Sequence, residues 1–404
     1  MRVPEAGVGS LYGEAELSAI SRVLCSGESL ARGPERPAFE AEFAAACGAR
    51  HALALSSGTA ALHLCAQILR LKAGDEVICT PQTFWATVVA LVARGVRIRF
   101  ADIDPETLNL DPATIERHIT PRTRAIYLVH HGGNPADLSA IRGVATAHGL
   151  PVVEDCAHAP GAAHRGEPIG SGDLCCFSFH SLKNMTTLGM GGMLTTGNDK
   201  WAQEASRLRA MGIVGQEAPR QGGFGPYRKP DFDLNDQSAG SWDSGWAAIE
   251  ETGTNFGMGE VQAAVGRVQL GKLQQVNARR AQIAGQYDSA LGQTDALRPL
   301  CVHDEDRSAR HLYTCFVRRE AGVDRDELAR YLQERAGIQI VLRFFPLHLH
   351  AGLQPFGHRY GECPVCERVW FEEQLNLPIA PSMSQEQVDW VCEALAHGVR
   401  ACRK

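Results

Sequence analysis

Short apolar runs alternate along this chain with stretches of helical periodicity. An apolar run at residues 52–55 is followed by a turn and then by residues 60–71, where apolar positions fall on one helical face. Looser copies of this unit follow, with strands predicted at 76–80, 96–101, 125–129, 151–154 and 174–179 and helices at 84–93, from 111, and at 138–147. This alternation predicts an α/β fold with a mostly parallel sheet flanked by helices.

The two ends of the chain carry different patterns. Helices are predicted before the body at 14–24 and 38–47, and a long helix at 258–291 follows it. Beyond it the pattern predicts a smaller α/β region with strands at 313–317 and 338–342 and helices at 324–335 and 385–399. We therefore expect two domains, a large ligand-binding domain at 1–270 and a small C-terminal domain at 271–404.

Residues 212–255 interrupt this pattern. They are rich in glycine and proline and show no sustained periodicity, which predicts a long loop. Long loops inside a compact domain are usually functional or lid-like.

Composition narrows the class of partner. The chain has 404 residues, 44% of them hydrophobic and 21% charged, with a formal charge of −6 and no long run of lysine or arginine. This argues against nucleic acid or an anionic membrane and favours a small-molecule ligand. The chain shows no apolar signal core at its start and no apolar segment of about 18 residues, so we expect a cytoplasmic protein. The thirteen cysteines are mostly isolated and are expected to be reduced.

Polar residues cluster where the predicted strands end, and ligands of parallel sheets bind at the carboxyl ends of strands. Ser57, Gly58 and Thr59 lie between the first of these strands and its helix. The free N–H groups of a helix start form an anion site suited to phosphate. An ordinary helix cap explains the same residues, and both interpretations stay open at this point.

Two further strand ends carry ionisable groups. Asp155 would be poorly solvated and in need of a cationic partner such as a protonated pyridine nitrogen, and His158 follows it closely. A helix cap for Asp155 and a hydrogen-bonded core imidazole for His158 are the alternatives. Lys183 lies after the next strand and a few residues after Ser178. An apolar run precedes this lysine, and a glycine cluster follows it. Such a lysine can form a Schiff base with a carbonyl, although most lysines are simply solvated.

Several other motifs carry less weight. Phe84 follows a third strand end, where it could stack on a flat heteroaromatic ring or belong to the core. Arg343 or His348, near the end of an apolar-rich strand, could contact the substrate or be structural. The histidine pairs at 130–131 and at 348 and 350 lack a supporting metal motif, so no metal is expected. No G-x-G-x-x-G follows a predicted strand, which argues against a dinucleotide-dependent dehydrogenase.

A phosphate seat, a stacking aromatic, an aspartate for a pyridinium and an isolated lysine together describe a pyridoxal phosphate site. The sequence resembles the DegT/StrS-type sugar aminotransferase family through nearly its whole length. Five segments carry the resemblance: 57–62 (SGTAAL), 80–87 (TPQTFWAT), 154–159 (EDCAHA), 178–183 (SFHSLK) and 253–258 (GTNFGM). The resemblance implies an aspartate-aminotransferase-like fold of type I and a homodimer with active sites at the subunit interface.

The resemblance also implies a role for each site residue. Lys183 would hold the cofactor as a Schiff base and shuttle the proton, and Asp155 would keep the pyridine nitrogen protonated. His158 would lie near the ring hydroxyl, and Phe84 would stack on the ring. The phosphate would be bound by Ser57, Gly58, Thr59 and Ser178, and by Asn255 of the partner subunit. The family usually carries arginine where Gly257 stands.

The implied activity is transfer of an amino group from glutamate or glutamine to the ketone of a keto-sugar, often nucleotide-linked, or of a keto-cyclitol. It would serve amino-sugar, aminocyclitol or antibiotic biosynthesis. One alternative is a pyridoxamine-dependent sugar dehydratase of the same fold, which the resemblance associates with histidine in place of Lys183. A second is a binding or regulatory protein that kept the fold without catalysis.

Overall fold

The computed structural model describes residues 1–212 and 251–404. Its centre is a seven-stranded sheet in the order β1-β9-β8-β5-β4-β2-β3. Neighbouring strands pair in parallel except for β9, which is antiparallel to both β1 and β8. The strands are β1 (His51–Leu55), β2 (Glu76–Cys79), β3 (Arg97–Phe100), β4 (Thr123–Val129), β5 (Val152–Asp155), β8 (Leu174–Ser178) and β9 (Gly192–Thr196). The mostly parallel α/β architecture predicted from the alternating pattern is confirmed.

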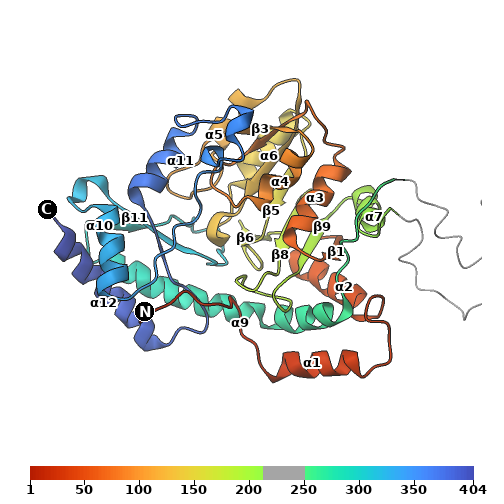
Figure 1. The fold of residues 1–404 in the computed structure, drawn as a ribbon, viewed down its shortest axis with the longest axis horizontal. Helices are drawn as coiled ribbons and strands as arrows, with labels where there is room; N and C mark the ends of the chain where they lie inside the picture. The colour runs from red at the N-terminus through yellow and green to blue at the C-terminus, as the bar shows by residue number, and fades with distance from the viewer. Residues whose placement is uncertain (213–250) are drawn as a thin grey trace, which may run out of the picture.

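Each face of the sheet is covered by its own set of helices, because side chains of a strand point alternately to opposite faces. One face packs against α3 (Gly58–Ile68), α4 (Ala86–Ala93) and α7 (Asp199–Leu208). The other packs against α2 (Glu35–Cys47), α5 (Pro112–Ile115), α6 (Leu138–Ala147) and the first part of α9 (Glu260–Leu291). Outside this body, α1 (Glu14–Leu24) lies along α9 (Figure 1).

The C-terminal part of the chain forms a second layer. A three-stranded antiparallel sheet of β10 (Leu297–Pro299), β11 (Tyr313–Val317) and β12 (Gln374–Leu377) packs with α10 (Arg325–Arg330) and α12 (Gln385–Cys402). The long helix α9 runs from the large sheet to these elements (Figure 1). Val3 is buried in the same apolar cluster, so the start of the chain packs on the C-terminal elements. The proposed division at residue 270 falls within α9 and stays a prediction.

Some elements differ from the sequence prediction. The strand predicted at 338–342 is wrong: Ile338 makes only an isolated bridge with Val3, because this stretch pairs with the N-terminal segment. The third strand of the small sheet is instead β12, which the sequence reading missed along with β9. The helix predicted at 84–93 begins at Ala86, which leaves Phe84 in the preceding loop.

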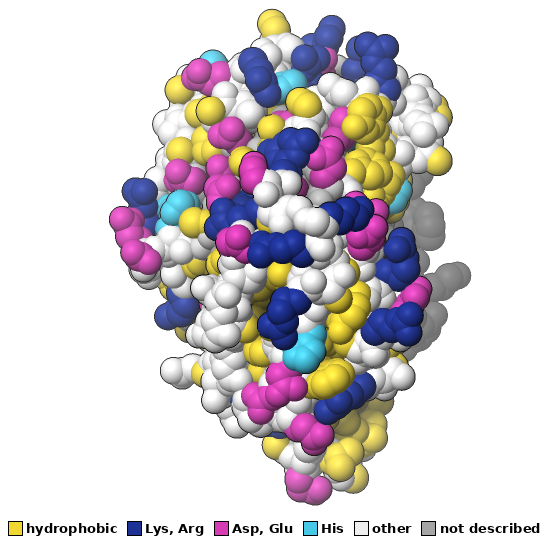
Figure 2. Space-filling model, turned by 90° about the vertical axis from the view of Figure 1, so that its left-hand side faces the viewer, with side chains coloured by type: hydrophobic (Ala, Val, Ile, Leu, Met, Phe, Trp, Pro, Cys, Tyr) yellow, Lys and Arg dark blue, Asp and Glu magenta, His cyan; other side chains and the backbone are white. Residues whose placement is uncertain are grey.

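Two general properties of the surface bear on partners. On the face shown in Figure 2, basic and acidic side chains are interspersed, so neither sign dominates that face. Within residues 1–212 and 251–404, no helix combines the length and the apolar character that a membrane crossing requires. Most of the loop predicted at 212–255 lies outside the described residues.

Candidate active site

A cavity of about 390 Å³ opens at the carboxyl ends of the parallel strands. Of the predicted site residues, eight line it: Ser57, Gly58, Thr59, Phe84, Asp155, His158, Ser178 and Lys183. They lie at or just beyond the carboxyl ends of β1, β2, β5 and β8, so the predicted strand ends converge on one cavity. Asn255 does not line this cavity; it is exposed and forms a bridge with Ala210.

Asp155 is the buried anion of the cavity, 5% exposed. It accepts a hydrogen bond from the hydroxyl of Thr87 (2.7 Å) and one from the backbone N–H of Ala157 (3.1 Å). Thr83 in turn lies 2.7 Å from the Thr87 hydroxyl, so it donates to Thr87. Burial raises the pKa of Asp155, and the two donors and the charge of Lys183 offset part of this rise. Among the described residues no cation forms an ion pair with it, which leaves its charge available to a ligand.

Lys183 lies on the loop that follows β8, where its amine faces the same cavity. Burial lowers its pKa from 10.5 to about 8; the positive charge of Arg343 adds to this effect and the negative charge of Asp155 opposes it. A lowered pKa increases the fraction of neutral amine at neutral pH, and the neutral amine is the nucleophile. The loop is held by Gly9, whose N–H donates to the carbonyl of Ser181.

The start of α3 forms one end of the cavity. The first N–H groups of a helix have no partner within the helix, and here the Ser57 hydroxyl accepts only that of Ala60, at 3.1 Å. A side chain at Gly58 would place its Cβ 2.9 Å from the Cβ of Ser178, so only glycine allows this approach. The remaining N–H groups and the hydroxyls of Thr59 and Ser178 therefore provide a compact anion-binding corner.

His158 belongs to an aromatic stack. Its ring lies 4.4 Å from that of His311 and 5.6 Å from that of Phe344, centroid to centroid. His311 is oriented by Asn184, whose Oδ1 lies 3.0 Å from its Nδ1. Burial and the nearby charge of Lys183 hold the pKa of both histidines well below the usual range, so they are neutral. The Nδ1 atom of His158 is buried without a hydrogen-bond partner among the described residues.

Phe84 differs from the other site residues in being 58% exposed. Its ring contacts that of Phe344 with centroids 5.8 Å apart. The alternative that Phe84 is an ordinary core residue is therefore wrong. Its ring lines the cavity, where it is accessible to a flat ligand.

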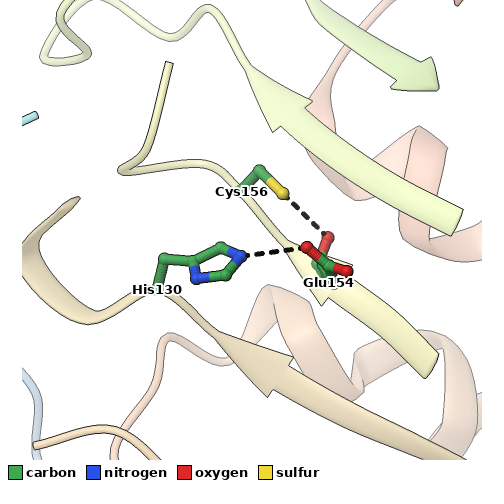
Figure 3. Close-up of side chains that lie close together, drawn as sticks. All are labelled: His130, Glu154 and Cys156. Carbon is green, nitrogen blue, oxygen red and sulfur yellow. Dashed lines mark hydrogen bonds and ion pairs between the residues drawn. The ribbon is translucent and has the colours of Figure 1, made fainter. Parts of the chain in front are cut away.

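A buried cluster behind the cavity contains potential metal ligands, His130, Glu154 and Cys156 (Figure 3). Their ligand atoms are already engaged. The Nδ1 of His130 accepts from the N–H of Ala136 (3.1 Å), so its Nε2 carries the proton and donates to Glu154 (3.1 Å). The second oxygen of Glu154 accepts from Arg142 (3.0 Å). Hydrogen bonding accounts for this cluster without an ion.

Arg343 and His348, the two candidate substrate contacts from the sequence, lie in different surroundings. Arg343 lines the cavity, whereas His348 is buried elsewhere and lies 2.7 Å from Glu367, in a structural pair. At Gly257, where the resemblance leads one to expect arginine, a Cβ would lie 3.5 Å from a guanidinium nitrogen of Arg36. A positive charge is therefore present beside Gly257, supplied from α2.

The comparisons with known proteins agree with this geometry. Residues 11–396 match the DegT/DnrJ/EryC1/StrS aminotransferase family, and the chain belongs to that family. It is 39% identical over 388 residues to the spore coat polysaccharide biosynthesis protein SpsC of Bacillus subtilis strain 168, covering 95% of this chain and 94% of SpsC.

Solved structures show the same likeness. DesV of S. venezuelae, in complex with a ketimine intermediate, superimposes with a TM-score of 0.82 at 33% identity, covering 95% of this chain and 94% of DesV. The PLP form of Spr1654 from Streptococcus pneumoniae gives 0.84 at 25% identity, with 100% of both chains covered. The protein is a pyridoxal phosphate-dependent aminotransferase with the fold of the sugar aminotransferases.

The cavity residues fit this cofactor. A buried carboxylate without a cationic partner, an anion-binding helix start and an unpartnered buried imidazole nitrogen match its pyridinium, its phosphate and its ring hydroxyl. When bound, pyridoxal phosphate supplies an electron-poor ring that stabilises negative charge on the adjacent substrate carbon. Asp155 would keep the ring nitrogen protonated, the start of α3 would hold the phosphate, and Lys183 would move the proton.

Several residues in or behind the cavity wall escaped the sequence analysis. Thr87, which lies behind Asp155, donates a hydrogen bond to it, and His311 stacks on His158. Glu5 and Arg280 reach the cavity wall from segments far apart in the chain. Thr87 lies within one of the segments that carry the family resemblance, and His311 lies two residues before a predicted strand. These positions in the sequence could have identified Thr87 and His311 as candidates. No local pattern marks Glu5 or Arg280, because they reach the cavity only through tertiary packing.

Proposed function

We propose that this aminotransferase moves an amino group from glutamate or glutamine to the ketone of a keto-sugar, commonly nucleotide-linked, or of a keto-cyclitol. The observation that carries the proposal is the shared cavity of Lys183, with its lowered pKa, and Asp155, with its unpaired charge. Similarity to SpsC, a polysaccharide biosynthesis protein, supports a sugar acceptor. Amino-sugar, aminocyclitol or antibiotic biosynthesis is the corresponding setting.

The proposed roles follow from where the side chains lie. Lys183 binds the cofactor and carries the proton, Asp155 holds the ring nitrogen protonated, and His158 offers its unpartnered nitrogen to the ring hydroxyl. Phe84 covers the ring. Ser57, Gly58, Thr59 and Ser178 hold the phosphate at the start of α3.

We also propose that the active form is a cytoplasmic homodimer. Asn255 is exposed and stands apart from the cavity of its own chain. Its proposed contact with the cofactor phosphate therefore requires a second copy of the chain. Sedimentation of the purified protein tests this state, and a monomer that is fully active would contradict the interface role of Asn255.

The principal test uses the visible absorption of the bound cofactor. Purified protein incubated with pyridoxal phosphate is expected to be yellow, to lose this band with glutamate or glutamine, and to regain it with the correct keto-sugar or keto-cyclitol. Lys183→Ala is expected to lose both the covalent band and turnover, whereas Lys72→Ala, at an exposed lysine, serves as the matched control. A wild-type protein that stays colourless with cofactor would refute the proposal.

A further inference from the structure

Arg343 brings a positive charge into the cavity from the C-terminal part of the chain. It lines the same cavity as Lys183, His158 and His311, and its charge contributes to lowering the pKa of all three. The backbone at this position is fixed on both sides. Its N–H donates to Oδ1 of Asn376 at 2.8 Å, and its carbonyl accepts from the side-chain amide of Gln374. The guanidinium is thus held by a rigid backbone close to the catalytic lysine.

The guanidinium of Arg343 forms an ion pair with the carboxylate of Glu5. Glu5 lies on the N-terminal segment, and its own N–H donates to Gln339 at 3.0 Å. The side chains of Arg343 and Glu5 are 24% and 31% exposed, so the pair faces the cavity and solvent rather than the core. Ion pairs that remain solvent-accessible contribute little stability, and an incoming carboxylate can therefore replace Glu5.

The other guanidinium in the cavity wall, Arg280, is not available in this way. It is 2% exposed, and its nitrogens donate to the backbone carbonyls of His311 (3.2 Å), Ile379 (3.0 Å) and Gly9 (2.7 Å). These bonds tie three segments of the cavity wall together. Lys183 is reserved for the cofactor. Within the described lining of the cavity, Arg343 remains as the cation that a ligand anion can bind.

We propose that Arg343 binds the α-carboxylate of the amino donor, and that Glu5 is the internal carboxylate which the donor displaces. This inference rests on the proposed function, in which an α-amino acid is the donor. Glutamate and glutamine both carry a carboxylate on the carbon that bears the reacting amine, and that carbon has to lie beside Lys183. An arginine near Lys183 suits this carboxylate, since guanidinium and carboxylate form two parallel charge-assisted hydrogen bonds.

The assignment makes Arg343 a residue of one half-reaction only. A keto-sugar or keto-cyclitol acceptor has no carboxylate on its reacting carbon, so it has no group for this contact. Glu5 opposes the donor because it occupies the guanidinium in the ligand-free protein. Removal of the carboxylate of Glu5 should therefore strengthen donor binding, whereas removal of the guanidinium should weaken it.

The experiment measures the donor half-reaction by itself. Bleaching of the cofactor band is followed in single turnovers against glutamate concentration, and binding of 2-methylglutamate, which lacks the α-hydrogen, is measured by calorimetry. Arg343→Gln is expected to weaken the apparent affinity for glutamate and the affinity for 2-methylglutamate, each by on the order of 10- to 100-fold. Regeneration of the band by the keto acceptor should change by less than about twofold. Glu5→Gln should tighten donor binding. The control is Arg319→Gln, at an exposed arginine paired with Glu372, which should leave the affinities for glutamate and 2-methylglutamate unchanged.

An Arg343→Gln enzyme with wild-type dependence on glutamate, or with acceptor binding weakened equally, would overturn the assignment. If Arg343→Gln does not bind cofactor, the Glu5→Gln variant is the test. An affinity of Glu5→Gln for 2-methylglutamate equal to that of the wild type would also overturn the assignment. Absence of bleaching in the wild-type protein would instead refute the proposed function, so the two failures are distinguishable.

Discussion

Glu154 and Asp155 are consecutive buried carboxylates at the end of β5, yet their surroundings differ completely. Because side chains alternate along a strand, Asp155 points to the face covered by α3 and α4, and Glu154 to the face covered by α6. Asp155 receives hydrogen bonds but no cation from the described residues. Glu154 contacts both His130 and the cation Arg142.

The pKa values of the two groups move in opposite directions for this reason. Burial dominates at Asp155 and raises its pKa. At Glu154 burial also opposes the charge, but His130 and Arg142 outweigh it and hold the pKa below its usual range. A buried charge satisfied by its own chain is structural, whereas one left without a partner marks a place for a ligand. The comparison thus separates a carboxylate that is paired within the fold, Glu154, from the adjacent one that we propose contacts the cofactor, Asp155.

The largest expected effect is on activity at Asp155. Asp155→Asn keeps the size of the side chain but cannot stabilise a protonated ring nitrogen. We expect the rate of the donor half-reaction to fall by on the order of 100- to 1,000-fold, while the thermal stability of the cofactor-free protein stays near that of the wild type. Stopped-flow absorbance and a melting curve measure the two effects. A variant with wild-type rates would refute the role of Asp155.

The next effect is on stability at Glu154. Glu154→Gln removes the anion that Arg142 and His130 share, and breaking a buried pair costs about 3 kcal/mol of unfolding free energy. Denaturant unfolding measures this loss. Glu167→Gln is the matched control, because Glu167 lies 3.7 Å from the same arginine but is 72% exposed, and we expect its effect to be below about 0.5 kcal/mol. Equal effects of the two substitutions would contradict the comparison.

A smaller effect is expected at Thr87, which donates a hydrogen bond to Asp155. Thr87→Val removes this donor at nearly constant volume. We expect the donor half-reaction to slow by roughly fivefold to tenfold, since a hydrogen bond of this kind contributes about 1 kcal/mol. Thr83→Val removes only the second member of the chain of hydroxyls and should have the lesser effect. The reverse order would argue against support of Asp155 through Thr87.

The smallest effect concerns pH. Glu154 has a lowered pKa in the folded protein, so its contribution is present above its unfolded pKa of about 4.3 and is lost as pH falls through the folded value. Asp155 has a raised pKa, so its contribution is present below about 3.9 and is lost as pH rises through the folded value. In cofactor-free protein, Glu154→Gln should reduce the loss of melting temperature on acidification, and Asp155→Asn should increase it. Parallel pH profiles for both variants would contradict this.

Asp155 and Lys183 are predicted from the sequence to lie at strand ends facing one crevice, and both line the same cavity in the structure. Asp155 comes directly after a run that is predicted as a buried strand, and Lys183 lies on the loop after the next one; parallel strands bring such positions to one edge of a sheet. The same reasoning predicted that a helix starts at residues 57–59, and α3 does begin at Gly58 with Ser57 as its cap. Local pattern was sufficient wherever one strand and its loop supply the group.

The remaining features depend on contacts between distant segments. The stretch at 338–342 has the composition of a strand, but its backbone pairs with residues near Val3, which no periodicity reveals. β12 alternates polar and apolar residues over only four positions and directly follows a helical turn, so its pattern was too short to recognise. The pair of Arg343 with Glu5 likewise joins the N-terminal segment to the C-terminal part of the chain.

Residues 1 and 404 differ as attachment points for a surface or a fusion partner, because the N-terminal segment, unlike the last residues of the chain, contributes to the described cavity wall. Lys404 lies on the outer side of the C-terminal elements, where its N–H donates to Gly322. Residues 4–6 and Gly9 instead form part of the cavity wall, and a Cβ at Gly9 would lie 2.0 Å from the carbonyl oxygen of Leu182. We therefore expect a fusion at residue 1 to strain the segment that supports the loop of Lys183, and a fusion at residue 404 to leave that loop undisturbed.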